Sequence, residues 1–225
     1  MVLRELWRAY DQLVAAGRTS ACQPGCCACC SGRVLLTTLE GRLLAAHLRG
    51  AGQEALLQAA ALAPAGPGPA SGFNALARMC LAGQESADDP AADAQTDARS
   101  RTCPLLVEGL CAVYEVRPLA CRCMASKERC QAGGAATQDP WWVTVDTAFL
   151  QIAEQVDAGG GLGWLPRVLA GLEEGETAGL LVCENLPGLP APPQHQERLS
   201  RLLMQVFSRP LHGQPLGLWI KRLRV

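Results

Sequence analysis

Residues 21–32 read ACQPGCCACCSG and place five cysteines within nine positions: Cys22, Cys26, Cys27, Cys29 and Cys30. Adjacent cysteines are poor partners for one disulfide, and a run this dense offers no unstrained scheme that pairs all of them. The Gln, Pro, Gly and Ser residues around them also lack the apolar pattern of a buried core segment. The stretch therefore predicts a thiolate metal site in an irregular loop, with the rest of the fold arranged around it.

A second cysteine-rich stretch follows after a long gap and contains Cys103, Cys111, Cys121, Cys123 and Cys130. Thiols two or three residues apart can turn around one metal ion or one edge of a cluster. No histidine lies in either stretch, because His47, His195 and His212 are all remote. Soft sulfur ligands select zinc or iron–sulfur clusters over magnesium or calcium. We therefore expect the two stretches to converge on an all-cysteine centre.

Composition narrows the class of protein further. The chain has 225 residues, a formal net charge of −1 and 49% hydrophobic residues, so it can bury a substantial core. The near-zero charge gives no electrostatic reason to expect nucleic acid or an anionic membrane as a partner. No apolar run is long enough for a membrane span, and residues 1–14 lack the apolar centre of a signal peptide. We expect a cytoplasmic protein, whose twelve cysteines stay reduced.

Hydrophobic periodicity predicts a mainly α-helical fold. An apolar stripe runs through residues 2–16, and Gly17 is a stop signal. Thr37 and Glu40 have the spacing of a capping box before a helix that ends near Gly50, and RVLLT before them resembles a short strand. Further helices are expected at about residues 53–63, 73–82, 143–157, 164–173 and 196–207.

The domain organisation is expected to be simple. We predict one domain over residues 1–225, a compact helical domain in which the cysteine-rich segments 22–40 and 103–130 converge on a metal centre. Two proline-, glycine- or acid-rich stretches, 63–72 and 84–102, are predicted to be flexible loops. The glycine-rich stretch DAGGGLGW at 157–164 is interpreted as a hinge between helices.

The two cysteine segments resemble a known family. The pattern C…GC…CC at 22–30, V…T…LE at 34–40 and CPLL…GLCAVYEVRPLACR from residue 103, with a later cysteine, is similar to the YkgJ-type cysteine-cluster proteins, the CxxCxxCC zinc- or iron-chelating domains. The resemblance covers under a quarter of the chain. One branch of the family is similar to flagellin lysine N-methylases, which use S-adenosylmethionine with an iron–sulfur cluster implicated. This chain is much shorter than those enzymes.

The resemblance implies a set of ligands. By position in the motif, the ligand cysteines are Cys22, Cys26, Cys29, Cys30, Cys103, Cys111, Cys121 and Cys130. Cys27 and Cys123 stand where the family usually has other residues and are interpreted as bystanders, or as substitute ligands when a neighbouring cysteine is oxidised. The lone cysteines Cys80 and Cys183 are expected to be buried small apolar residues instead.

Several alternatives stay open at this stage. Eight thiolates suffice for two zinc sites, for clusters, or for one larger centre. The overlap of the Cys26–Cys29 and Cys27–Cys30 spacings favours an iron–sulfur cluster, such as 4Fe–4S, over two zinc knuckles, with Zn²⁺ as the alternative. The first function hypothesis is redox chemistry or S-adenosylmethionine-dependent methyl transfer on a protein or small-molecule substrate. The second is a structural zinc module that binds a partner.

A radical S-adenosylmethionine motif is a weaker alternative. Cys22-x3-Cys26-x2-Cys29 has its spacing, but a helix and not a barrel strand precedes it, and Ala28 stands where an aromatic residue is usual. Near the second segment, Arg117 and Arg122 are interpreted as partners of carboxylates or loop carbonyls. Tyr114 is expected to pack over the site, and the pair Trp141 and Trp142 to pack in the core.

Overall fold

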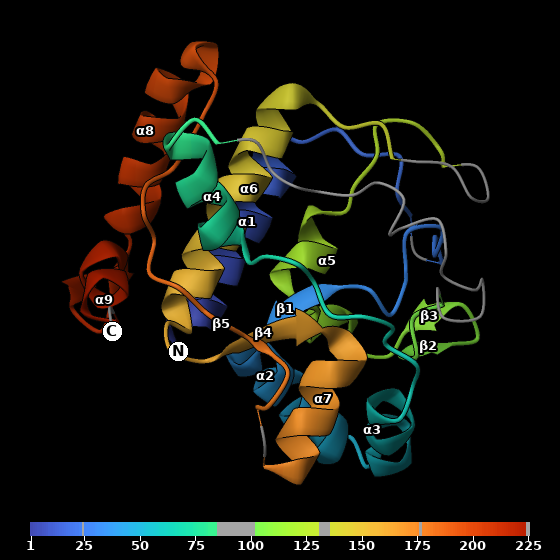
Figure 1. Cartoon of the computed structure of the whole chain (residues 1–225). Coiled ribbons are helices and arrows are strands. Elements are labelled where there is room, and N and C mark those ends of the chain that lie inside the picture. Colours follow the sequence, from blue (N-terminus) through green and yellow to red (C-terminus); the bar gives the residue numbers. More distant parts are fainter. Residues whose placement is uncertain (24, 85–101, 131–135, 176, 224–225) are drawn as a thin grey trace.

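The computed structural model describes residues 1–23, 25–84, 102–130, 136–175 and 177–223. The described residues form nine α-helices and only short strands, so the mainly α-helical fold is confirmed. Figure 1 shows a group of long helices at one end, a second helical group around a small sheet, and the cysteine-bearing loops projecting to one side. Among the described residues, no helix combines the length and the apolar character needed to cross a bilayer.

Helix α6 (Pro140–Val156) is the centre of the larger hydrophobic core. Asp139 caps its first turn by accepting a hydrogen bond from the Trp141 backbone N–H at 2.9 Å, and Pro140 occupies a position that needs no donor. Phe149 is fully buried and meets the ring of Tyr10 edge-on, with centroids 5.2 Å apart. The partners of α6 in this core are α1 (Val2–Gly17), α5 (Leu119–Cys123), α8 (Pro193–Phe207) and α9 (Leu216–Arg222).

The smaller core lies beneath the cysteine-rich loops. It joins α2 (Thr38–Gly50), α3 (Glu54–Ala61) and α7 (Leu165–Glu174), and it includes Leu105 and Val113 from the second cysteine segment. Helix α2 approaches α7 closely at Gly41, where a Cβ atom would lie 2.7 Å from the side chain of Val168. This core therefore supports the second cysteine segment from below.

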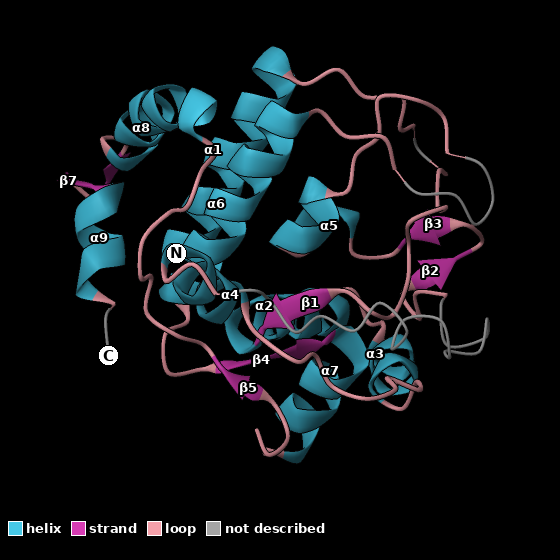
Figure 2. Cartoon of the chain, turned by 45° about the horizontal axis from the view of Figure 1, so that its top comes forward, coloured by secondary structure: helices cyan, strands magenta, loops and turns pink. Residues whose placement is uncertain are grey.

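A three-stranded antiparallel sheet connects the two helical groups (Figure 2). Its order is β1 (Leu35–Thr37), β4 (Gly161–Trp164) and β5 (Leu181–Val182), with Leu36 opposite Gly163 and Gly161 opposite Val182. The prediction of a hinge at 157–164 was wrong, because its last four residues form the central strand. The glycines allow this strand to pack closely under Leu180, whose side chain would lie 2.7 Å from a Cβ at either Gly161 or Gly163.

The other predicted elements agree with the structure at the level of their positions. The strand in RVLLT is β1, and the helices expected near 53–63, 73–82, 143–157, 164–173 and 196–207 are α3, α4 (Phe73–Leu81), α6, α7 and α8. Residues 63–72 contain no helix or strand. The predicted loop at 84–102 lies almost entirely outside the described residues. Strands β6 (Pro210–Leu211) and β7 (Gln214–Pro215) form a small hairpin before α9.

Candidate metal centre and adjoining pocket

The first cysteine segment is built from consecutive tight turns. The described residues from 18 to 34 contain no helix or strand. The Cys26 N–H donates to the Gln23 carbonyl at 2.9 Å, and the Cys30 N–H donates to the Cys27 carbonyl at 3.0 Å. Gly25 adopts φ +83°, a left-handed conformation that suits glycine. Cys22, Cys26 and Cys27 are exposed, whereas Cys29 and Cys30 are partly buried against the protein.

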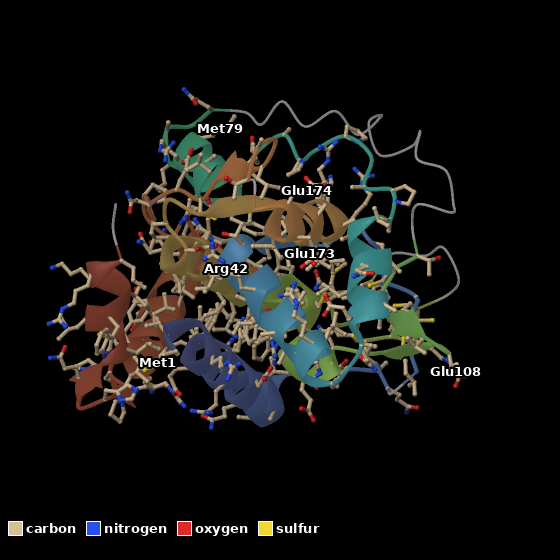
Figure 3. The ribbon with its side chains drawn as sticks, turned by 90° about the horizontal axis from the view of Figure 1, so that it is seen from below. Met1, Arg42, Met79, Glu108, Glu173 and Glu174 are labelled. Atoms are coloured by element: carbon tan, nitrogen blue, oxygen red, sulfur yellow. The ribbon has the colours of Figure 1, made fainter. Side chains whose placement is uncertain are left out.

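The second segment folds back on itself through a two-residue hairpin that sequence reasoning did not predict. Strand β2 (Leu106–Val107) pairs with β3 (Leu110–Cys111), and Leu106 lies opposite Cys111. Glu108 and Gly109 between them have φ values of 51° and 79°, the combination required by a type I′ turn. Figure 3 shows Glu108 at the tip of this hairpin, with sulfur atoms gathered beside it. The hairpin thus returns Cys111 toward Cys103.

Helix α5 carries two cysteines that face different surroundings. Residues two positions apart on an α-helix, such as Cys121 and Cys123, are separated by about 200° of rotation around the helix axis. Cys121 is partly buried and interacts electrostatically with Cys103 and Cys111. Cys123 is 5% exposed and packs in the larger core, where it interacts with Asp146 instead. This divergence gives a structural reason for treating Cys123 separately from the other cysteines.

The two cysteine segments touch at both ends of the first run. The Cys103 N–H donates to the Cys30 carbonyl at 3.2 Å, which joins the last cysteine of the first segment to the first of the second. At the other end, the Ala21 N–H donates to the Ser126 carbonyl at 2.8 Å. The Ser126 N–H in turn donates to the Cys22 sulfur at 3.5 Å. The segments therefore lie side by side.

A buried carboxylate connects the helices next to these segments. Glu40 is 3% exposed, and its Oε2 accepts from the Thr37 N–H at 3.0 Å, which completes the predicted capping box of α2. Its Oε1 accepts from the Leu119 N–H at 2.8 Å, at the start of α5. One side chain thus fixes the helix that carries Cys121 to the strand–helix junction that follows the first segment. Burial raises the pKa of Glu40 above its ordinary value.

Five thiols are linked by electrostatic interactions, which cross between the two segments at Cys30, and we refer to them as the inner thiols: Cys29, Cys30, Cys103, Cys111 and Cys121. A hydrogen bond from the Cys30 thiol lowers the pKa of Cys29 to about 6, and the Arg117 guanidinium acts in the same direction. The hydrogen bond with Cys29, burial and neighbouring thiols raise the pKa of Cys30. Burial, with repulsion from Cys103 and Cys111, raises the pKa of Cys121. Soft cations bind such a donor set as thiolates.

The inner thiols are neighbours without forming a closed coordination shell. Within the described residues, no three Cys, His, Asp or Glu side chains stand close enough together to hold one metal ion. Among the remaining predicted ligands, Cys22 and Cys26 are exposed and Cys130 is partly buried, and residues 131–135 after Cys130 are outside the description. The chemistry of the donor set fits a soft metal, and convergence on a metal centre stays a prediction.

The two arginines near the second segment have different roles. Arg122 pairs with the Asp11 carboxylate and donates to the carbonyls of Glu115 and Arg117, as predicted. Arg117 instead stacks on the ring of Tyr114 at 4.0 Å and lies close enough to Cys29 to lower its pKa. Arg117 therefore stacks on an aromatic ring, where a carboxylate or loop-carbonyl partner was expected.

Three other sequence-based expectations can be compared with the structure. Cys183 is 2% exposed, and its thiol donates to the Gly161 carbonyl at 3.3 Å, as expected of a buried cysteine. Cys80 is exposed, so the expectation that it is buried was wrong, because α4 turns that face to solvent. Trp141 and Trp142 pack in the larger core, as predicted.

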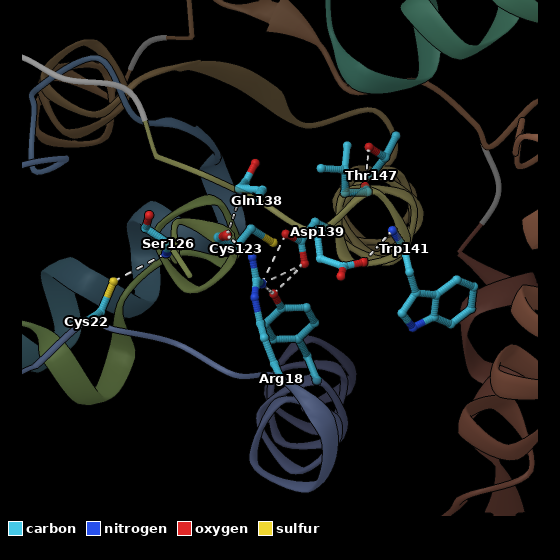
Figure 4. A network of polar contacts seen from close by, with 11 residues as sticks. Arg18, Cys22, Cys123, Ser126, Gln138, Asp139, Trp141 and Thr147 are labelled. Atoms are coloured by element: carbon cyan, nitrogen blue, oxygen red, sulfur yellow. Dashed lines mark hydrogen bonds and ion pairs between the residues drawn. The ribbon is translucent and has the colours of Figure 1, made fainter. Parts of the chain in front are cut away.

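A buried polar network lies beneath the first segment on the α5–α6 side. The Tyr10 hydroxyl donates to Asp146 Oδ1 at 2.6 Å, and Arg18 Nη1 lies 3.1 Å from each carboxylate oxygen of Asp146. Arg18 also donates to the Cys123 carbonyl at 3.1 Å, and Gln138 donates to the same carbonyl at 3.2 Å. Figure 4 shows Cys123 between Arg18 and Gln138, with Ser126 and Cys22 on its other side. Burial raises the pKa of Asp146 despite these partners.

A pocket of about 300 Å³ lies between this network and the first cysteine segment. One wall is a face of α6 formed by Val143, Asp146, Thr147 and Leu150, and the opposite wall comes from residues 29–35. Cys29 and Cys123 line it from different elements. The pocket therefore borders both the inner thiols and the buried network. Sequence reasoning missed it because its walls come from segments that are far apart in the chain.

Comparison with known proteins identifies no relative: no family model, no curated protein and no solved structure matches the chain.

Proposed function

We propose that the protein holds an all-cysteine metal centre, with an iron–sulfur cluster as the first candidate and Zn²⁺ as the alternative. The observation that carries the proposal is the backbone hydrogen bond between Cys103 and Cys30, which sets the two cysteine-rich segments beside each other. A thiolate centre needs sulfur atoms from turns that face one another. The contact supports the proposal because it brings together the backbones of two segments that are distant in sequence.

The inner thiols are the candidates for the core of this centre. Four of them suffice for a four-cysteine cluster or one zinc ion. Cys22, Cys26 and Cys130 are the candidates for further ligation when the exposed turns close around the metal. The Arg117 guanidinium near Cys29 would offset part of the negative charge of a thiolate cluster. Cys27 is left outside the set because its position in the motif carries another residue in the family that the segments resemble, and Cys123 because it packs in the larger core.

Two features favour an iron–sulfur cluster over zinc. The Cys26–Cys29 and Cys27–Cys30 spacings overlap, so they cannot form two separate zinc knuckles. The pocket beside Cys29 also gives a substrate room next to the centre. A bound cluster would supply one-electron redox chemistry, and methyl transfer from S-adenosylmethionine, a two-electron group transfer, is the other reaction class proposed. The residues of this chain would hold the cluster and orient the substrate.

A structural zinc site is the second candidate function, and one observation favours it. The described residues from 18 to 34 have no helix or strand, so the first segment lacks the hydrogen-bond ladders that order other parts of the fold. A zinc ion bound between the segments would order this loop. In that case the protein would be an interaction or accessory module.

The test is metal and acid-labile sulfide content, with an optical spectrum, on protein purified without oxygen. Cys29→Ser and Cys111→Ser should lower the metal content, whereas the exposed and remote Cys80→Ser is the matched control and should not. Iron with sulfide supports the cluster, and zinc alone supports the structural module. Equal metal content in all three variants, or no metal in the unmodified protein, would contradict the proposal.

A further inference from the structure

A second pocket, of about 630 Å³, lies between α1, α2 and α5, and we refer to it as the α1 pocket. Its volume is within the range that ligand pockets occupy. Two adjacent rows of α1 side chains form one wall, with residues four apart in each row: Arg4, Arg8 and Gln12 in one, and Trp7, Asp11 and Ala15 in the other. The other wall consists of His47 on α2, Glu115 and Val116 of the short 3-10 helix Tyr114–Val116, and Arg122 on α5. None of the described cysteines lines the α1 pocket.

One end of the α1 pocket carries an excess of positive charge. Arg8 Nη1 donates to Glu5 Oε2 at 2.6 Å, and Arg209 donates to Glu5 Oε1 from Nε at 3.1 Å and from Nη2 at 3.0 Å. Two guanidinium groups therefore share the single carboxylate of Glu5. Arg4 is exposed one turn before Arg8, and within the described part of the chain it has no acidic partner. The three arginines exceed Glu5 by two positive charges, so this end attracts an anion.

The acidic residues of the lining lie toward the other end. The Asp11 carboxylate is paired with Arg122, whose side chain is buried. Arg122 Nη2 also donates to the Glu115 carbonyl at 2.8 Å, which places Glu115 at the Asp11 end of the pocket. Asp11 is seven residues from Arg4, about 10 Å along the helix, which is about one Debye length at 0.1 M salt. Glu115 therefore repels an anion at Arg4 only weakly, and its carboxylate can accept hydrogen bonds from the far end of a ligand.

The donors at the cationic end suit a phosphate group. Arg4 offers its whole guanidinium, and Arg8 offers the N–H groups that do not bind Glu5. Within the described residues, the side chains of Gln12 and His47 make no hydrogen bond. Arginine binds phosphate oxygens through two parallel N–H groups. The two excess positive charges also match the charge of a phosphate monoester, about −1.5 to −2 at pH 7.

We propose that the α1 pocket binds a phosphate monoester with a hydroxyl-bearing body, such as a sugar phosphate. The phosphate would lie at Arg4 and Arg8. The body would extend along α1 toward Ala15, with a hydroxyl group donating to the Glu115 carboxylate. The site goes beyond the proposed metal centre, and ligand binding there does not depend on a bound metal.

The experiment uses glucose 6-phosphate as the probe, with isothermal titration calorimetry on the full chain purified without oxygen. Saturable binding to one site is expected. Glucose, which lacks the phosphate, and inorganic phosphate, which lacks the body, should each bind at least about tenfold more weakly. Raising the salt concentration should weaken the binding of glucose 6-phosphate, because its phosphate meets exposed arginines.

Two variants and a control locate the site. Arg4→Gln removes one charge at an exposed position and should weaken glucose 6-phosphate binding at least about tenfold. Arg42→Gln is the matched control, because Arg42 is also exposed but lies on α2 outside the lining (Figure 3), and it should change the affinity less than about twofold. Ala15 is exposed on the pocket wall, so Ala15→Trp should fill the far end without unfolding the protein and abolish binding.

Four results would each overturn the proposal: no saturable binding, glucose or inorganic phosphate binding as tightly as glucose 6-phosphate, equal losses in Arg4→Gln and Arg42→Gln, or unchanged binding to Ala15→Trp. Binding of glucose 6-phosphate to protein without metal would leave this proposal standing while the metal proposal fails.

Discussion

Replacing Glu40 with alanine should destabilise the protein far more than an ordinary carboxylate substitution. The Glu40 carboxylate is the acceptor for two buried backbone donors, the N–H groups of Thr37 and Leu119. An unsatisfied buried donor costs about 1–3 kcal/mol, so two of them cost about 2–6 kcal/mol. Relief of the buried negative charge reduces this loss, because burial raises the pKa of Glu40. We expect Glu40→Ala to lower the free energy of unfolding by about 3 kcal/mol, within these bounds.

The assay is urea unfolding at neutral pH, followed by circular dichroism. Glu54→Ala is the matched control, because the Glu54 side chain is half exposed and its ion pair with Arg49 is 3.5 Å long. Such surface pairs contribute about 0–1 kcal/mol. A Glu40→Ala loss no larger than that of Glu54→Ala would refute the idea that Glu40 joins α2 to α5.

Glu40→Gln separates the hydrogen bonds from the charge. Its amide keeps one acceptor oxygen and leaves one of the two buried donors unsatisfied, so the loss should be about half that of Glu40→Ala. The pKa of Glu40 is raised above 4.5 in the folded protein, so the folded state holds this proton more tightly than the unfolded state. The proton-linked part of the stability from Glu40 is therefore fully present below pH 4.5 and declines as the pH rises through the folded pKa. Glu40→Gln should remove this part of the pH dependence, and an unchanged profile would contradict the pKa direction.

Three further substitutions test other parts of the fold. Tyr10→Phe removes the donor to Asp146 and should cost about 1–2 kcal/mol in urea unfolding; no change would mean that the network is not formed. Gly41→Ala places a Cβ 2.7 Å from Val168 and should lower the thermal midpoint, with a cost of about 1–3 kcal/mol, although alanine is the better helix former. A stabilised Gly41→Ala would refute the close approach of α2 and α7. Gly109→Val places a β-branched residue at φ 79°, which should distort the β2–β3 hairpin that carries Cys111 and so lower the metal content of the protein. A metal content equal to that of the parent protein would contradict this expectation.

Most helices could be predicted from the sequence because their signals are local. The apolar stripe of α1 and the capping box at Thr37 and Glu40 depend on residues within one or two turns. Strand β4 was missed for the opposite reason. Its glycines have low strand propensity, and they form a strand because Leu180 packs directly against them. Only the tertiary structure contains that contact.

The sequence shows which residue types make up the candidate site, but it shows little of how they are arranged in space. The density of cysteines and the absence of nearby histidine are enough to indicate thiolate chemistry. The second hydrogen bond of Glu40, from the Leu119 N–H, joins elements that are distant in the chain, so no sequence periodicity indicates it. The hairpin at Glu108 and Gly109 had a recognisable signal in its glycine, flanked by apolar residues on both sides. The proximity of Arg117 to Cys29 depends on how the first segment folds back, which the sequence does not show.

The contact between Cys30 and Cys103 has a consequence for the connectivity of the chain. A metal bound across these two segments would close the polypeptide from residue 30 to residue 103 into a ring that contains α2, α3 and α4. Cross-linking a loop of that length lowers the entropy of the unfolded chain by an amount worth about 4 kcal/mol. Loss of the metal would open the ring and return that entropy to the unfolded state. Oxidation of a few exposed cysteine sulfurs that releases the metal would therefore lower the free energy of unfolding of helices that contain no metal ligand.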